Sequence, residues 1–63
     1  MGHADFLLNK LVEIEFSNGD KKMVLIDHVV YYPNGGIMYF VEQGTERRYS
    51  TNLMISFRAA RHG

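Results

Sequence analysis

Apolar and polar side chains alternate with a period of two after the first ten residues, and this alternation constrains the fold more than any other feature. Val12, Ile14 and Phe16 alternate with glutamate and serine residues, the pattern of a strand with one buried and one solvated face. Asn18-Gly19 follows, and an Asn-Gly pair between two strand patterns is among the strongest short signals for a hairpin. The sequence therefore predicts antiparallel β-structure.

The second predicted strand is long and has apolar side chains in both phases. It runs from Lys21 to Tyr32. In a small sheet this pattern is typical of a strand that bends sharply and serves both halves, with a bulge near Asp27 and His28. Which phase faces the core stays open, and a shift by one residue would exchange the buried and exposed aromatic side chains.

Three further strands are expected after a turn at residues 33–36. The turn reads Pro-Asn-Gly-Gly, in which Pro fixes φ and the other residues accept left-handed conformations. Strands are predicted over residues 37–43, 46–50 and 53–57, with one 3₁₀ turn at 51–52. In the last strand, one face is expected to carry Leu53, Ile55 and Phe57 and the other Met54 and Ser56; Phe16, Phe40 and Phe57 are expected to face inward.

The chain is expected to form one domain over residues 1–63. Residues 4–10 are a lead-in or a single helical turn capped by Asp5, residues 11–58 a β-barrel, and residues 59–63 a flexible tail. A chain this short buries only about 60% of the surface that its unfolded form exposes. It has no cysteine, which removes disulfides, fits a cytoplasmic location and leaves oligomerisation as a source of further stability.

These elements predict an all-β fold, a small, strongly bent, five-stranded antiparallel barrel. The layout resembles that of Sm-like and SH3-like small barrels. Residues 4–8 would correspond to the short leading helix, residues 12–19 to a first strand that ends in Asn-Gly, and residues 51–52 to the tight passage between the last two strands. The Arg-Gly pair that precedes the last strand of Sm proteins is missing, so no uridine-binding residues are carried over.

Charge and hydropathy argue against two classes of partner. Seven Lys and Arg residues balance seven Asp and Glu residues, whereas proteins that coat nucleic acid or anionic membranes carry a positive excess. No stretch approaches the roughly 20 apolar residues of a membrane span. We therefore expect no membrane partner, and the net charge does not favour nucleic acid.

No group of residues predicts catalysis, a metal or a cofactor. His28 is the only histidine away from the ends, whereas zinc needs three or four converging ligands. Glu13 and Glu15 would stand roughly 7 Å apart on one strand face, a spacing that glycosidases use. A barrel of this size has no deep cleft beside them, so they fit a solvated face. We expect no enzyme, no metal site and no cofactor.

The aromatic and basic residues supply the candidate contact surface. Each tyrosine either covers the edge of the small core or belongs to an exposed contact patch. The arginines either form a solvated edge that deters strand pairing, hold an acidic protein surface, or bind phosphates beside stacked bases. The candidate partner-binding residues are Tyr31, Tyr32, Tyr39, Arg47, Arg48, Tyr49 and Arg58.

The function predicted from these features is that of a non-catalytic protein-interaction module, a small accessory or regulatory protein that acts by surface contact. Its partners would be another protein, a further copy of itself, or both. Met23, Met38 and Met54 would supply adaptable apolar contact, and sheet edges would supply hydrogen bonds. The alternative is a small nucleic-acid-binding barrel that uses the aromatic and basic surface.

Overall fold

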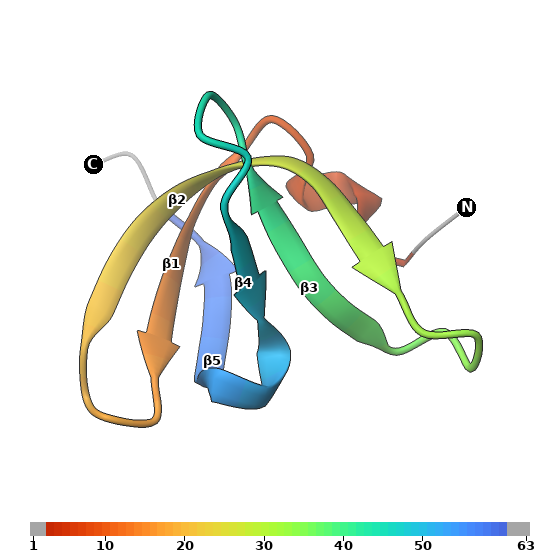
Figure 1. Ribbon diagram of the computed structural model, residues 1–63. Helices are drawn as coiled ribbons and strands as arrows, with labels where there is room; N and C mark the ends of the chain where they lie inside the picture. The colour runs from red at the N-terminus through yellow and green to blue at the C-terminus, as the bar shows by residue number, and fades with distance from the viewer. Residues whose placement is uncertain (1–2, 61–63) are drawn as a thin grey trace.

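The computed structural model describes residues 3–60 and contains one antiparallel sheet (Figure 1). The strand order is β4-β3-β2-β1-β5, which confirms the all-β prediction. No helix among residues 3–60 is long and apolar enough to cross a membrane. The elements are η1 (Asp5–Leu7), β1 (Leu11–Phe16), β2 (Lys21–Tyr31), β3 (Ile37–Glu42), β4 (Arg48–Ser50), η2 (Thr51–Leu53) and β5 (Met54–Ala59), where η denotes a 3₁₀ turn.

Strand β2 serves both halves of the sheet, as predicted. Its first part pairs with β1 and its second part with β3, and Figure 1 shows it arching over the molecule. The register with β3 shifts between Ile26 and His28, which places the extra residue of the bulge at Asp27. The bulge also settles the phase. Val24 and Ile26 are buried before it, whereas Val29 packs against the core after it.

The sheet does not close into a barrel. Strands β4 and β5 stand at its two ends, and within residues 3–60 neither pairs with the other. Strand β4 has only three residues, and η2 separates it from β5. The prediction of a closed barrel with little open edge is therefore too strong: the fold is a strongly bent open sheet with two edges.

The core lies inside the bend and joins both halves. Its fully buried side chains come from η1, β1, β2 and β3, with Phe40 the largest. The ring of Phe40 meets that of Phe57 edge-on, with centroids 4.9 Å apart, so β3 contacts β5 through aromatic packing although the two strands are not hydrogen-bonded. Phe16 and Phe57 are partly buried against the same cluster, which confirms that the three phenylalanines face inward.

The N-terminal segment forms the predicted helical turn and covers the bend of β2. Leu7 of η1 is buried in the core. The backbone N–H of Asn9 donates to the carbonyl oxygen of Ile26, and the N–H of Ile26 donates to that of Lys10. Asp5 does not cap the turn, since the capping position is Ala4 and no side chain caps it.

The β1–β2 hairpin turn matches its sequence signal. Gly19 has φ +94°, a conformation that glycine adopts without steric cost. The side chain of Asn18 accepts a hydrogen bond from the backbone N–H of Asp20 at 3.0 Å. These local interactions fix the register in which β1 and β2 pair.

The last strand differs from its predicted pattern. Leu53 belongs to η2, and β5 continues to Ala59, so residue 59 is part of the sheet rather than of a tail; residues 61–63 lie outside the described residues. The register with β1 skips Ile55, because Phe16 faces Met54 and the preceding residue faces Ser56. This bulge turns Ile55 outward and lets Met54 pack against the core.

Candidate functional site

The outer face of the β2–β1–β5 half presents two cross-strand rows of side chains. Val12 and Ile14 point into the core, so Glu13 and Glu15 point to the opposite face. Glu13 lies between Met23 and Arg58, and Glu15 lies between Lys21 and Ser56. We call this surface the outer face; its members are Glu13, Glu15, Lys21, Met23, Ser56 and Arg58.

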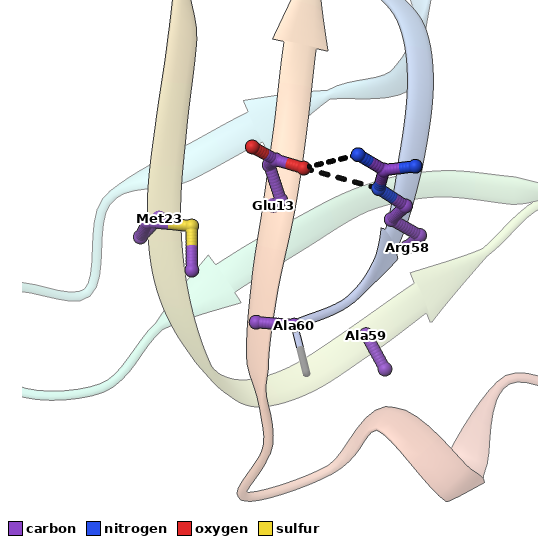
Figure 2. A pocket seen from close by; sticks show the side chains of 5 residues that line it. All are labelled: Glu13, Met23, Arg58, Ala59 and Ala60. Carbon is purple, nitrogen blue, oxygen red and sulfur yellow. Dashed lines mark hydrogen bonds and ion pairs between the residues drawn. The ribbon is translucent and has the colours of Figure 1, made fainter. Parts of the chain in front are cut away.

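Arg58 is held on the outer face by Glu13. Its Nε and Nη2 atoms lie 3.0 and 2.9 Å from Oε1 of Glu13 (Figure 2). The side chain of Arg58 is 77% exposed, and within residues 3–60 its other N–H groups have no hydrogen-bond partner. An exposed pair of this kind contributes little to stability. It does orient the guanidinium group while leaving most of its donors free.

A shallow hollow lies beside this ion pair. It is lined by Glu13, Met23 and Arg58 together with Ala59 and Ala60, and Figure 2 shows these side chains around it. A second hollow, lined by Glu15, Lys21 and Ser56 with the same ion pair, continues it along β1. The two hollows adjoin each other on the outer face.

Several large apolar side chains are exposed at or near this half of the sheet. Met23 and Leu25 of β2 are among them. Leu53, just before β5, is 59% exposed, and Ile55, in β5, is 63% exposed. Strand β1 separates the pair on β2 from the pair at β5.

The edge formed by β5 is open on the side away from β1, and a bulge at Ile55 interrupts it. Within the described residues β5 pairs only with β1, and it contains no Lys, Asp, Glu or Pro. Its one charge, on Arg58, is matched by Glu13. Natural edge strands are usually short, charged or interrupted, which deters pairing with other chains.

The edge formed by β4 is shorter than the β5 edge and lies beside two exposed arginines. It has three residues, begins at the exposed Arg48 and follows the exposed Arg47. Strand β5 is therefore the longer of these two sheet edges.

The predicted tyrosines fall into structural and exposed roles. The hydroxyl of Tyr31 accepts from the backbone N–H of Ala4, and Tyr31 packs against the core. Tyr49 packs on Phe16 with ring centroids 6.3 Å apart, and Lys22 Nζ lies 5.7 Å from the centroid of the Tyr49 ring. Tyr32, beside the β2–β3 turn, is exposed.

Of the predicted arginines, the structure brings only Arg48 against a predicted tyrosine. Its guanidinium carbon lies 5.2 Å from the ring centroid of Tyr39, a cation–π contact. Arg47 is exposed next to it in the chain. Arg58 lies on the outer face and contacts Glu13 rather than a tyrosine.

Sequence reasoning missed the pairing of Glu13 with Arg58 and the exposure of Leu53 and Ile55. The two charged residues are 45 positions apart, and only the β1–β5 register brings them together. A bulge at Ile55 has no local signal comparable to the Asn-Gly turn, because a regular alternating pattern continues through it.

A polar cluster at the β3–β4 hairpin perturbs the pKa of one carboxylate. Glu42 Oε1 accepts hydrogen bonds from the Thr45 hydroxyl at 2.6 Å and the Tyr49 hydroxyl at 3.3 Å. The Thr45 hydrogen bond chiefly lowers the pKa of Glu42; the Tyr49 hydroxyl and the charges of Lys22 and Arg47 lower it further, and partial burial opposes them. These contacts hold the β3–β4 hairpin together.

The β2 bulge brings two neighbouring titratable side chains together. His28 Nδ1 lies 2.8 Å from Asp27 Oδ2, and both side chains are about half exposed. In a regular strand they would point to opposite faces. Among residues 3–60, no group of three or more His, Cys, Asp or Glu side chains could hold a metal ion.

No protein-family model, curated protein or solved structure matches the chain.

Proposed function

We propose that the chain is a non-catalytic protein-interaction module that acts by surface contact and associates with itself. The observation that carries the proposal is the β5 edge, which within residues 3–60 pairs only with β1 and has the exposed Ile55 in the strand and the exposed Leu53 just before it. Strand addition to such an edge supplies main-chain hydrogen bonds, and neighbouring side chains supply specificity. Ser56 and Arg58 are the outer-face residues of β5, so their side chains would lie next to those of the added strand.

Light scattering after size exclusion tests this function. The protein is run at low and high salt, with and without a short single-stranded oligonucleotide. We expect a discrete oligomer whose mass is the same with and without the oligonucleotide. The mass should also change little with salt, because apolar contacts and main-chain hydrogen bonds depend weakly on salt. A monomer at high micromolar concentration would contradict self-association.

Two variants locate the contact surface. Ile55→Asp places a charge at the β5 edge and is expected to reduce the oligomer. Phe6→Asp is the matched control, since Phe6 of η1 is similarly exposed at 70% but is not part of β5. Equal effects of the two substitutions would count against β5 as the contact site.

Nucleic-acid binding is the second candidate, and the contact between Arg48 and Tyr39 favours it. An arginine on an aromatic ring beside a second basic residue, Arg47, can hold phosphates while a base stacks. Binding of a labelled single strand, followed by fluorescence anisotropy, should then weaken steeply with salt and be lost in Arg48→Ala. Lys21→Ala, which removes an exposed charge from the outer face, should retain it. Binding that is absent or insensitive to salt would exclude this candidate.

A further inference from the structure

We infer that the partner of the β5 edge is a second copy of this chain, joined through antiparallel β5–β5 pairing about a twofold axis at Phe57. The inference rests on the proposed self-association and specifies its geometry. The sheet would then continue from β2, β1 and β5 of one copy into β5, β1 and β2 of the other. Such an isologous contact is self-complementary and closes after two copies.

The backbone of β5 decides which residues can bond to a second copy. The N–H of Ala60 donates to the carbonyl oxygen of Leu11 at 2.8 Å, so the backbone groups of residue 60 point toward β1. Backbone groups alternate in direction along a strand. Those of Arg58 and Ser56 therefore also face β1, and those of Phe57 and Ala59 face away from the sheet.

Among the registers that this alternation allows, electrostatics and contact length favour the one centred on Phe57. A twofold axis at Arg58 would place two guanidinium groups opposite each other, and like charges in that position are destabilising. An axis at Ser56 would place Arg58 opposite Met54. An axis at Phe57 instead pairs residues 55–59 with residues 59–55 of the second copy. Arg58 of each copy then faces Ser56 of the other.

The outer face is complementary to itself in this register. Beyond Ser56 of the second copy, the same cross-strand row continues to Glu15 of that copy. The guanidinium group of Arg58, held by Glu13 on one edge, would direct its free donors toward that carboxylate. The twofold axis repeats the contact, so each copy supplies one arginine and one glutamate.

Apolar contacts agree with the same register. The half-buried Phe57 side chains would meet at the axis, and Ile55, 63% exposed, would lie beside the second copy at the end of the paired segment. Cross-strand apolar and aromatic pairs of this kind stabilise sheets. The short, arginine-flanked β4 edge would remain free, so the assembly is a dimer and not a ring built from β4–β5 contacts.

Cysteine crosslinking tests the register, because the chain has no cysteine of its own. In the proposed dimer, residue 56 of one copy is directly opposite residue 58 of the other in a non-hydrogen-bonded pair, with Cα atoms about 4.5 Å apart, within disulfide range. A mixture of Ser56→Cys and Arg58→Cys proteins should form a disulfide-linked heterodimer on mild oxidation. Phe6→Cys mixed with Ser56→Cys is the control and should not.

A backbone substitution provides an independent measurement. Ala59→Pro removes an N–H that faces away from β1, which an edge strand tolerates. It removes one β5–β5 hydrogen bond from each copy, two in the dimer, so the dimer dissociation constant should rise roughly thirtyfold. Sedimentation equilibrium measures this rise, and circular dichroism verifies that the variant is folded.

The outcomes separate this inference from the proposed function. A dimer that gives the 56–58 crosslink above the control supports both. A discrete oligomer of three or more copies, or a dimer without that crosslink, overturns the β5–β5 geometry but leaves self-association standing. A monomer at all concentrations overturns the geometry and the self-association together.

Discussion

The hydroxyl group of Tyr31 accepts a hydrogen bond from the backbone N–H of Ala4, 27 residues earlier, at 3.0 Å. The same hydroxyl donates to Asp5 Oδ1 at 3.3 Å. Because Ala4 is buried, these bonds attach the N-terminal turn to the second half of β2, where sequence alone suggested an aromatic contact residue.

Removing this hydroxyl should loosen the N-terminal turn. We expect Tyr31→Phe to lower the free energy of unfolding by about 1 kcal/mol, which in a chain this small corresponds to a fall of about 4–8 °C in Tm. Tyr32→Phe is the neighbouring control and should change Tm little, because Tyr32 is exposed. Thermal denaturation followed by circular dichroism measures both. Equal shifts would show that the bonds to Ala4 and Asp5 contribute nothing.

Glu42 should make stability depend on pH in the acid range. Its pKa is lowered in the folded protein, first by the Thr45 hydrogen bond. Its contribution is therefore fully present above the unfolded pKa of about 4.3 and is lost as pH falls through the lower folded value.

The test is a series of thermal unfolding curves from about pH 6 to about pH 3, below the ordinary glutamate pKa. Glu42→Gln should remove part of the decline in Tm over this range, and Thr45→Val should raise the pKa of Glu42, as followed by NMR titration of its carboxyl carbon. A Glu42 pKa unchanged in Thr45→Val would contradict the assigned cause.

Two isoleucines in the same sheet should respond very differently to the loss of one methyl group. Ile26 is fully buried, so Ile26→Val should lower the free energy of unfolding by about 1 kcal/mol. Ile55→Val should change it by only a few tenths of a kcal/mol, on the order expected for surface substitutions. Urea denaturation at low micromolar concentration compares them. A large effect at Ile55 under those conditions would place it in the core.

Gly19 should resist replacement for a conformational reason alone. A Cβ at this position would meet no atom within 4 Å, but φ is +94°. Gly19→Ala should therefore destabilise the protein by about 1 kcal/mol, the cost of a left-handed conformation for an L-residue. Gly19→Asn should cost less, since asparagine tolerates such conformations better. Chemical denaturation ranks the three proteins, and an alanine variant as stable as the parent would refute the argument.

Sequence reasoning succeeded where a feature is local. The bulge near Asp27 and His28 followed from apolar residues in both phases of one strand, and the β1–β2 hairpin followed from Asn18-Gly19. Barrel closure could not be predicted in the same way. It depends on whether β4 is long enough to reach β5, and the three-residue β4 followed by η2 leaves them apart.

The candidate site was less predictable because it is built from distant parts of the chain. Tyr31, Tyr32 and Arg58 were identified by residue type, yet the first carries a structural hydrogen bond, the second lies at a turn and the third pairs with Glu13. The alternating pattern of the last strand predicted that Ile55 lies on the same inward face as Phe57. The β1–β5 register and the bulge at Ile55 determine which side chains are exposed in β5. Neither feature produces a recognisable pattern in neighbouring residues of the sequence.

The pairing of β1 with β5 has a consequence for how the chain reaches this fold. Val12 lies opposite Ala59. The β5 side of β1, an early strand, is therefore covered only after β5, the last of the five strands, has been synthesised. Contacts between such distant positions slow folding, because the loop must close before the contact stabilises it. During translation, the edge of β1 that pairs with β5 stays open until residue 59 has left the ribosome. In that interval a nascent chain can pair at this edge with another chain that is being synthesised from the same mRNA.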